Sequence, residues 1–304
     1  MLAFIAPGQG AQTPGMLAPW IEDPALRALL ATWSDEIDLD LIRLGTTANA
    51  DEIKDTANAQ PLIVAAGLLG TRALSATNKF SFVAGHSVGE ITAAALAGVI
   101  SELDAMKLVR SRGIEMAKAA AVSPAGMAAV LGGDREDVLR AIADLGLVAA
   151  NDNGGGQIVA AGDLNALAQL APEGARVRAL AVAGAFHTSY MKPAVEPLRT
   201  LAATLEVSDP SCSVISNKDG AVVGNGREIL DRIVNQICNP VRWDLCMTTL
   251  SENISGALEV PPAGTLVGLL KRAVPAVETF ALKTVADLSL ADEFALRHNQ
   301  EVSN

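Results

Sequence analysis

The sequence is poor in aromatic residues and in cysteine, and it has no long uncharged apolar run. Phe, Trp and Tyr make up 3% of the 304 residues, although 50% of the residues are hydrophobic. That balance favours helices of small residues packed closely on a sheet. No uncharged apolar run reaches the roughly 18 residues that a membrane helix needs, so we expect no membrane partner. The opening apolar stretch is too short and too uncharged for a secretory signal.

The cysteines and the charge argue against further classes of protein. Cys212, Cys238 and Cys246 form no Cys-x-x-Cys pair and are odd in number, which indicates reduced thiols in a cytoplasmic protein. The net charge of −11 argues against nucleic acid as the main partner. The sequence holds neither a P-loop nor a dinucleotide-binding fingerprint, and we expect neither a cofactor nor a metal.

The order of the predicted elements divides the chain into two parts. Residues 2–6 and 80–84 are predicted as short buried strands. Residues 126–183 follow the order β-α-β-β-α-β, which is typical of a ferredoxin-like unit. We therefore predict an α/β fold with a large discontinuous subdomain over 1–125 and 184–290. The small ferredoxin-like subdomain over 126–183 is inserted into it, and residues 291–304 form a mobile tail.

A candidate nucleophile stands at the end of the second predicted strand. Gly85, Ser87 and Gly89 form a Gly-x-Ser-x-Gly pattern between that strand and a helix of small residues. Such a turn exposes the serine, lets strand and helix approach closely, and offers backbone N–H groups to an oxyanion. The pattern without its flanks also fits a glycine-rich turn with an idle serine. Its strand and helix flanks favour Ser87 as a nucleophile.

A serine needs a base, and the chain has three histidines. His86 adjoins Ser87, where neighbouring side chains in a sharp turn point apart, so we expect it to pack beneath the turn. His298 falls in the predicted tail and would not be held in place. His187 lies in a loop between a strand and a helix, where α/β folds place their chemistry. His187 is therefore the predicted base.

One arginine lies on the apolar side of a predicted helix. In the helix 101–120, Arg112 falls between Leu108 and Met116 on the apolar arc. A guanidinium is rarely buried without an anion. Its partner is either a carboxylate of the protein or the carboxylate of a ligand, and the nearby Ser87 favours the ligand.

Several motifs together resemble the malonyl-CoA:acyl carrier protein transacylase family, over about residues 2–272. They are Pro7-Gly8-Gln9-Gly10, Gly85-His86-Ser87-Val88-Gly89-Glu90, Arg112-Gly113, Gly184-Ala185-Phe186-His187 and Asn239-Pro240-Val241-Arg242-Trp243. The resemblance implies an α/β-hydrolase-like large subdomain that carries a ferredoxin-like insertion. It also implies a monomer that acts on malonyl-CoA and an acyl carrier protein in fatty acid synthesis.

The resemblance also implies a role for each matching residue. Ser87 would attack the malonyl thioester and His187 would be its base. The amides of Gln9 and Val88 would form the oxyanion hole, and Arg112 would hold the malonyl carboxylate. The carbonyl of Gln236 would orient the histidine in place of a triad acid.

Further features bear on selectivity and docking. Val88 and Phe186 match the pattern that accompanies malonyl preference over methylmalonyl in related acyltransferases, although both also suit ordinary packing. Lys192 would contact an acidic carrier protein or be a solvated lysine. The sequence departs from the family at Ala6, where many members have Phe, and at 261–265, where a Gly-Pro-Gly-Lys type segment is usual. The second departure would affect docking of CoA or of the carrier.

Three other functions remain open from the sequence. A serine hydrolase would use the same turn, but Arg112 and the missing triad acid argue against it. An acyltransferase that serves a polyketide synthase would keep the chemistry and change the pathway. A module that only binds a carrier protein would not need Ser87, His187 and Arg112 together.

Overall fold

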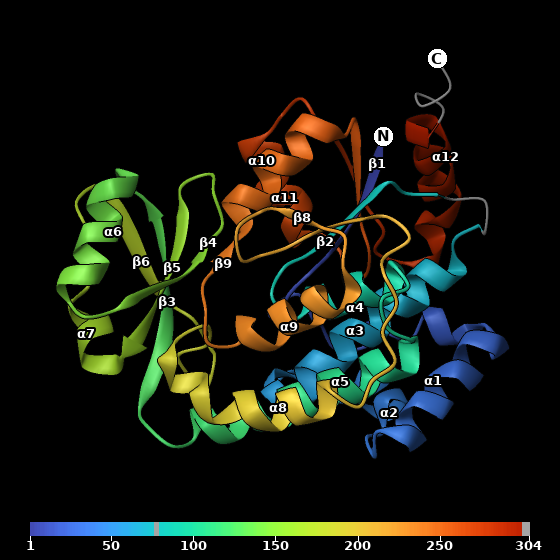
Figure 1. The fold of residues 1–304 in the computed structure, drawn as a ribbon, viewed down its shortest axis with the longest axis horizontal. Coiled ribbons are helices and arrows are strands. Elements are labelled where there is room, and N and C mark those ends of the chain that lie inside the picture. Colours follow the sequence, from blue (N-terminus) through green and yellow to red (C-terminus); the bar gives the residue numbers. More distant parts are fainter. Residues whose placement is uncertain (76–78, 300–304) are drawn as a thin grey trace.

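The computed structural model describes residues 1–75 and 79–299, and two sheets organise them (Figure 1). The larger sheet has the strand order β11-β10-β1-β2-β7-β8. Its first five strands in that order run parallel, and β8 is antiparallel to β7. The strands are β1 (Leu2–Ala6), β2 (Phe82–Gly85), β7 (Ser213–Ile215), β8 (Val222–Val223), β10 (Gly256–Glu259) and β11 (Glu278–Ala281).

Helices cover both faces of this sheet because the residues of β1 alternate between two cores. Leu2 and Phe4 face one apolar cluster, and Ala3 and Ile5 face the other. The first cluster includes α1 (Pro24–Glu36), α2 (Leu41–Thr46), α3 (Thr56–Ala73), α4 (Gly89–Leu96), α5 (Glu102–Ala120), α8 (Val195–Ala202), α9 (Gly226–Gln236) and α12 (Leu288–Asn299). The second includes α10 (Trp243–Asn253) and α11 (Thr265–Ala273).

Short 3-10 helices complete the large part of the chain. They are η1 (Trp20–Glu22), η2 (Glu52–Lys54), η3 (Ser189–Ala194) and η4 (Val285–Asp287). The last of the described elements corrects a prediction. Residues 291–299 are not a mobile tail but belong to α12, whose Ala291, Phe294 and His298 are buried. Apolar residues at helical spacing against β10 and β11 hold the helix in place. Residues 300–304 of the predicted tail lie outside the described residues.

The smaller sheet confirms the ferredoxin-like part of the predicted fold. Its strand order is β6-β3-β5-β4-β9. The elements are β3 (Ala125–Gly132), α6 (Arg135–Asp144), β4 (Val148–Asp152), β5 (Gln157–Asp163), α7 (Leu164–Gln169) and β6 (Ala175–Ala179). These strands pair antiparallel in the β-α-β-β-α-β connection that the sequence predicts. Figure 1 shows this unit beside the large part of the molecule, with α6 and α7 on its outer side.

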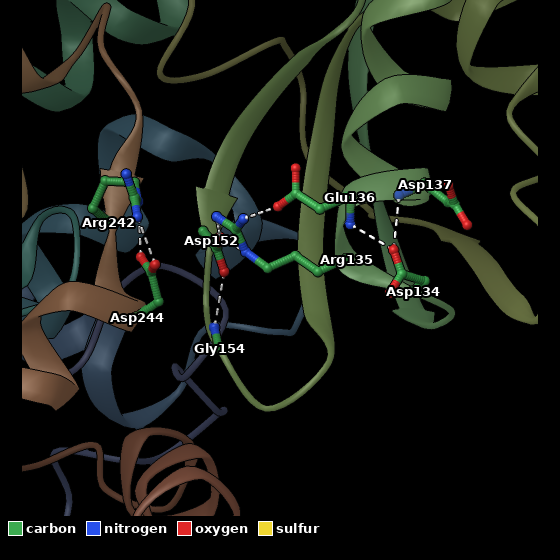
Figure 2. Close-up of polar contacts among 8 residues, drawn as sticks. All are labelled: Asp134, Arg135, Glu136, Asp137, Asp152, Gly154, Arg242 and Asp244. Carbon is green, nitrogen blue, oxygen red and sulfur yellow. Dashed lines mark hydrogen bonds and ion pairs between the residues drawn. The ribbon is translucent and has the colours of Figure 1, made fainter.

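The smaller sheet also takes in a strand from outside 126–183. Strand β9 (Val241–Arg242) pairs parallel with the end of β4, where Asp152 lies opposite Arg242. Figure 2 shows the polar contacts at this junction: Arg135 donates to Asp152, and Arg242 forms an ion pair with Asp244. The sheet thereby joins α10 of the large part directly. The predicted boundaries between the subdomains remain a prediction.

None of the described helices is both long and apolar enough to cross a bilayer. The three cysteines are free thiols, as predicted.

Candidate active site

A tight turn between β2 and α4 presents Ser87. Ser87 has a φ of 54°, which a non-glycine residue adopts only under constraint. Gly85 and Gly89 are required by the close approach of the two elements. A Cβ on Gly85 would collide with the backbone of Gly89, and one on Gly89 would collide with the carbonyl of Ala6. The Gly-x-Ser-x-Gly pattern is thus explained by packing, and the turn leaves the serine at the start of a helix.

Ser87 lies at one end of a hydrogen-bonded chain. Its Oγ is 2.8 Å from Nε2 of His187, and Nδ1 of His187 is 2.9 Å from the carbonyl oxygen of Gln236. His187 has a φ of 60°, and its own N–H donates to the carbonyl of Ile237. The histidine is therefore fixed at both its backbone and its ring. A carbonyl that accepts from Nδ1–H leaves Nε2 free to accept the serine proton.

The surroundings keep the His187 ring neutral. Burial, together with the nearby charge of Arg112, lowers the pKa of His187 to about 3. The imidazole is 3% exposed, so its charged form loses most of its hydration. At neutral pH the ring is a proton acceptor, which is the state that a general base needs.

Arg112 is 1% exposed and points at the same serine. Its Nη1 donates to Oε1 of Gln60 at 2.7 Å and its Nη2 to Oε1 of Gln236 at 3.0 Å. Nη2 also lies 3.4 Å from Oγ of Ser87. The Nε atom has no partner among the described residues, and no described carboxylate lies within ion-pair distance of the guanidinium. Burial lowers the pKa of Arg112 to about 10, so it stays charged at neutral pH. The edge formed by Nε and Nη2 has the geometry that pairs with a carboxylate, but Nε is buried and Arg112 is not among the described residues that line the cavity at Ser87.

Further polar residues hold this arrangement and were not found from the sequence. Oδ1 of Asn217 accepts the N–H of Ser87 at 2.8 Å, and its Nδ2 donates to the carbonyl of Gly85 at 2.6 Å. Glu90 and Gln60 are buried as well. The available signal was the one that revealed Arg112: Glu90 interrupts a helix of small residues, and Gln60 an apolar one.

A cavity of about 260 Å³ opens at Ser87 and His187. Gln9, Gln60, His86, Asn153 and Phe186 line it, together with residues of the smaller sheet. Val88, 0% exposed, is not among the described lining residues, whereas Phe186 is. Gln9 and Ser87 both line the cavity, and the oxyanion role of the Gln9 amide and that of the Val88 amide remain predictions.

The other two histidines differ from their predictions. His86 does not pack beneath the turn but lines the cavity, where its Nε2 lies 2.8 Å from Oδ1 of Asn153. The smaller sheet, brought over the turn by the fold, supplies that partner. His298 is held in place after all: it is 4% exposed, and its ring contacts Ser255 and Glu278. Lys192 is exposed on η3, and its contact with a carrier protein remains a prediction.

The described residues contain no group of His, Cys, Asp or Glu side chains that could hold a metal ion. The expectation that no cofactor takes part remains a prediction.

Comparisons with known proteins agree with this geometry. A family model described as an acyl transferase domain matches residues 3–295. A protein of Mycobacterium tuberculosis called malonyl CoA-acyl carrier protein transacylase is 52% identical over 303 residues. The match covers 97% of this chain and 99% of that protein.

Solved structures are similar over the same length. The crystal structure called MCAT from Mycobacterium tuberculosis has a TM-score of 0.92 at 51% identity. That match covers 96% of this chain and 99% of the other. A malonyl-transacylase solved in complex with its type II PKS acyl-carrier protein has a TM-score of 0.89 at 31% identity, covering 96% and 99%.

Proposed function

The chain belongs to the acyl transferase family, among the malonyl CoA-acyl carrier protein transacylases, and from this we propose its reaction. It transfers the malonyl group of malonyl-CoA to the phosphopantetheine thiol of an acyl carrier protein. The observation that carries the proposal is a buried arginine, with no carboxylate partner among the described residues, beside a serine bonded to a neutral histidine. Such a site selects acyl groups that carry a carboxylate, because the arginine can bind that carboxylate.

The first half of the reaction acylates Ser87. Nε2 of His187 takes the hydroxyl proton while Oγ attacks the thioester carbonyl. The N–H groups of Gln9 and Val88 stabilise the negative oxygen of the tetrahedral intermediate. When this intermediate collapses, the C–S bond breaks and His187 returns the proton to the departing CoA sulfur. The malonyl group is left as an ester on Ser87, with its carboxylate on Arg112.

The second half repeats these steps with the carrier. His187 takes the proton of the phosphopantetheine thiol, and the sulfur attacks the Ser87 ester. The Ser87 oxygen then leaves and recovers the proton, so the enzyme returns to its starting state. The carbonyl of Gln236 keeps Nδ1–H fixed throughout, in the place that an acid takes in a triad.

The proposed reaction also suggests the metabolic pathway, the acyl selectivity and the cellular location of the protein. We infer that the product supplies extender units for fatty acid synthesis, in the cytoplasm, from a monomeric enzyme. The three free thiols support the cytoplasmic setting. Phe186 on the cavity wall supports a preference for malonyl over bulkier acyl groups.

Intact-mass measurement tests the proposal. The protein is mixed with malonyl-CoA, and then with a carrier protein bearing phosphopantetheine. We expect a malonyl adduct that Ser87→Ala abolishes and Ser111→Ala, on the polar side of α5, retains. The adduct should move to the carrier thiol when the carrier is added. Steady release of CoA into water, without an adduct and without any effect of the carrier, would instead identify a hydrolase.

A further inference from the structure

The buried network below Ser87 contains one carboxylate that the proposed reaction does not use. Glu90 lies in the first turn of α4 and is 6% exposed. Its Oε1 accepts the N–H of Asn217 at 2.6 Å, and its Oε2 accepts from Nε2 of Gln236 at 2.5 Å. Both oxygens of Glu90 therefore face N–H donors.

The side-chain amide of Gln236 links Glu90 to Arg112. A guanidinium can only donate, so the atom of Gln236 that faces Nη2 of Arg112 must be the amide oxygen. The amide nitrogen then donates one hydrogen to Glu90, and its second hydrogen is shared between Oδ1 of Asn217 at 3.0 Å and the carbonyl of Ser87 at 3.1 Å. In this orientation Glu90 has to accept, and a carboxylate anion meets that requirement at both oxygens.

Protonation of Glu90 would disturb this arrangement. A proton on Oε2 would point at the N–H of Gln236, and the conflict is relieved when the amide turns over. The amide nitrogen would then face Arg112, which would lose an acceptor, and the Ser87 carbonyl would lose one of its two donors and keep the N–H of Glu90. A proton on Oε1 would instead break the bond from Asn217, the residue whose side chain accepts the N–H of Ser87.

We propose that Glu90 is a positioning residue for acyl-group selection: as an anion it fixes the Gln236 amide so that Arg112 is held beside Ser87. The inference rests on the proposed function, since it concerns how the carboxylate of the acyl group is read. Glu90 is the counter-charge of Arg112, and the two interact through one amide rather than by contact. Arg112 therefore keeps its Nε edge for the ligand.

Burial is the main influence on the pKa of Glu90, and the nearby positive charges oppose it. Burial raises the pKa of Glu90 to about 7, while the Asn217 N–H and the charges of Arg112 and Arg232 favour the anion. Asp219 opposes them, and the nearby thiol of Cys246 stays neutral because burial and Glu90 raise its pKa.

A second cavity gives Glu90 a separate route to protons. It measures about 650 Å³, and its lining includes Glu90 and Gln236 together with charged side chains, among them Lys218, Glu228 and Arg232. None of its described lining residues lines the cavity at Ser87 and His187. Glu90 can thus gain or lose a proton without involving the acyl cavity.

The pH dependence of selectivity tests the proposal. The initial rates of Ser87 acylation by malonyl-CoA and acetyl-CoA are measured from pH 5.5 to 8.5 for the natural protein, Glu90→Gln and Glu228→Gln. In the natural protein we expect the ratio of the malonyl rate to the acetyl rate to fall about tenfold toward low pH, which is the effect of losing one charge-assisted hydrogen bond. The fall should follow the titration curve of a single proton. Glu90→Gln should have a low, flat ratio, and Glu228→Gln, on the wall of the second cavity, should follow the natural protein. A constant ratio in the natural protein, or the same titration in Glu90→Gln, would overturn the proposal.

A second measurement needs no acylation. The side-chain amide of Gln236, assigned in the ¹⁵N NMR spectrum through Gln236→Glu, should shift with pH in the unmodified natural protein with the same midpoint. An amide signal that does not move with pH would refute the coupling, even if Glu90→Gln failed to fold. A moving signal in a protein that no acyl-CoA modifies would support the coupling and reject the proposed function.

Discussion

Replacing Arg112 by methionine isolates its contribution to selectivity. Methionine keeps much of the length and the apolar contacts on α5 but removes the charge and the planar fork. Among the residues that the structure describes, none pairs with Nε of Arg112, and Nη2 lies 3.4 Å from Oγ of Ser87. A carboxylate on that edge would gain two charge-assisted hydrogen bonds. At about 1.5 to 3 kcal/mol for each bond, the malonyl group would lose roughly 3 to 6 kcal/mol in the variant.

That loss corresponds to a fall of roughly 10² to 10⁴-fold in kcat/KM for malonyl-CoA. Acetyl-CoA has no carboxylate to lose, so its kcat/KM should change by only about threefold. The assay measures both values by CoA release in the presence of carrier protein. Arg110→Met is the matched control: it lies on the same helix, and its guanidinium donates to the carbonyl of Ala57 rather than into the site.

Equal losses for both substrates would refute this reasoning. Arg112 would then be a structural arginine whose bonds to Gln60 and Gln236 hold the helices together, the alternative that the sequence left open. A malonyl loss below about tenfold would also be too small for a bidentate contact in a buried site.

Three further predictions concern stability and are measured by urea unfolding. Gly113→Ala should lower the free energy of unfolding by about 1 to 3 kcal/mol, because the new Cβ would lie 2.9 Å from the backbone oxygen of Thr56. Gly268→Ala should raise it by up to about 1 kcal/mol, because no described atom lies within 4 Å of the new Cβ. Equal effects of the two substitutions would contradict the packing argument. His298→Ala should lower the free energy of unfolding by about 1 to 3 kcal/mol, because the buried ring bonds to Ser255 and Glu278. Malonyl transfer should be unchanged, since His298 is not among the described residues that line the cavity at Ser87. No loss of stability would instead support the predicted tail. For Glu90, whose pKa rises from 4.5 to about 7 on folding, protonation favours the folded state, so its stabilising effect is complete below pH 4.5 and is lost as the pH rises through 7. The stability of the natural protein relative to Glu90→Gln should fall by on the order of 3 kcal/mol between pH 4.5 and 8, and a rise would reverse the sign of this argument.

Protonation of Glu90 is therefore expected to raise the stability of the fold and to lower the selectivity for malonyl. The protonated form favours folding because a buried carboxylate loses its hydration, whereas the anion holds Gln236 and Arg112 in place. A protein selected only for stability would not keep this carboxylate. Its presence beneath the nucleophile fits a site that accepts a cost in stability for the sake of function.

Features that depend on neighbours along the chain could be predicted from local sequence patterns. The turn at Ser87 needs a strand, small residues at three positions and a helix, and all of them lie within residues 82–96. Arg112 could be placed because helical periodicity puts it on the apolar arc. The ferredoxin-like insertion could be predicted because each of its strands and helices has a local sequence pattern, and the order of these elements is typical of that motif.

Contacts between residues that are distant in the sequence depend on the tertiary fold. Every residue has a backbone carbonyl, so a sequence pattern cannot identify which carbonyl accepts a hydrogen bond from His187. That carbonyl belongs to Gln236, 49 positions later, and only the family resemblance indicated it. The same holds for the link between Glu90 and Arg112, which passes through a third side chain. Strand β9 and helix α12 were missed because a two-residue strand and a polar helix end carry too little local signal. Their places are set by the sheet edge and the core that they cover, which exist only once the rest of the chain has folded.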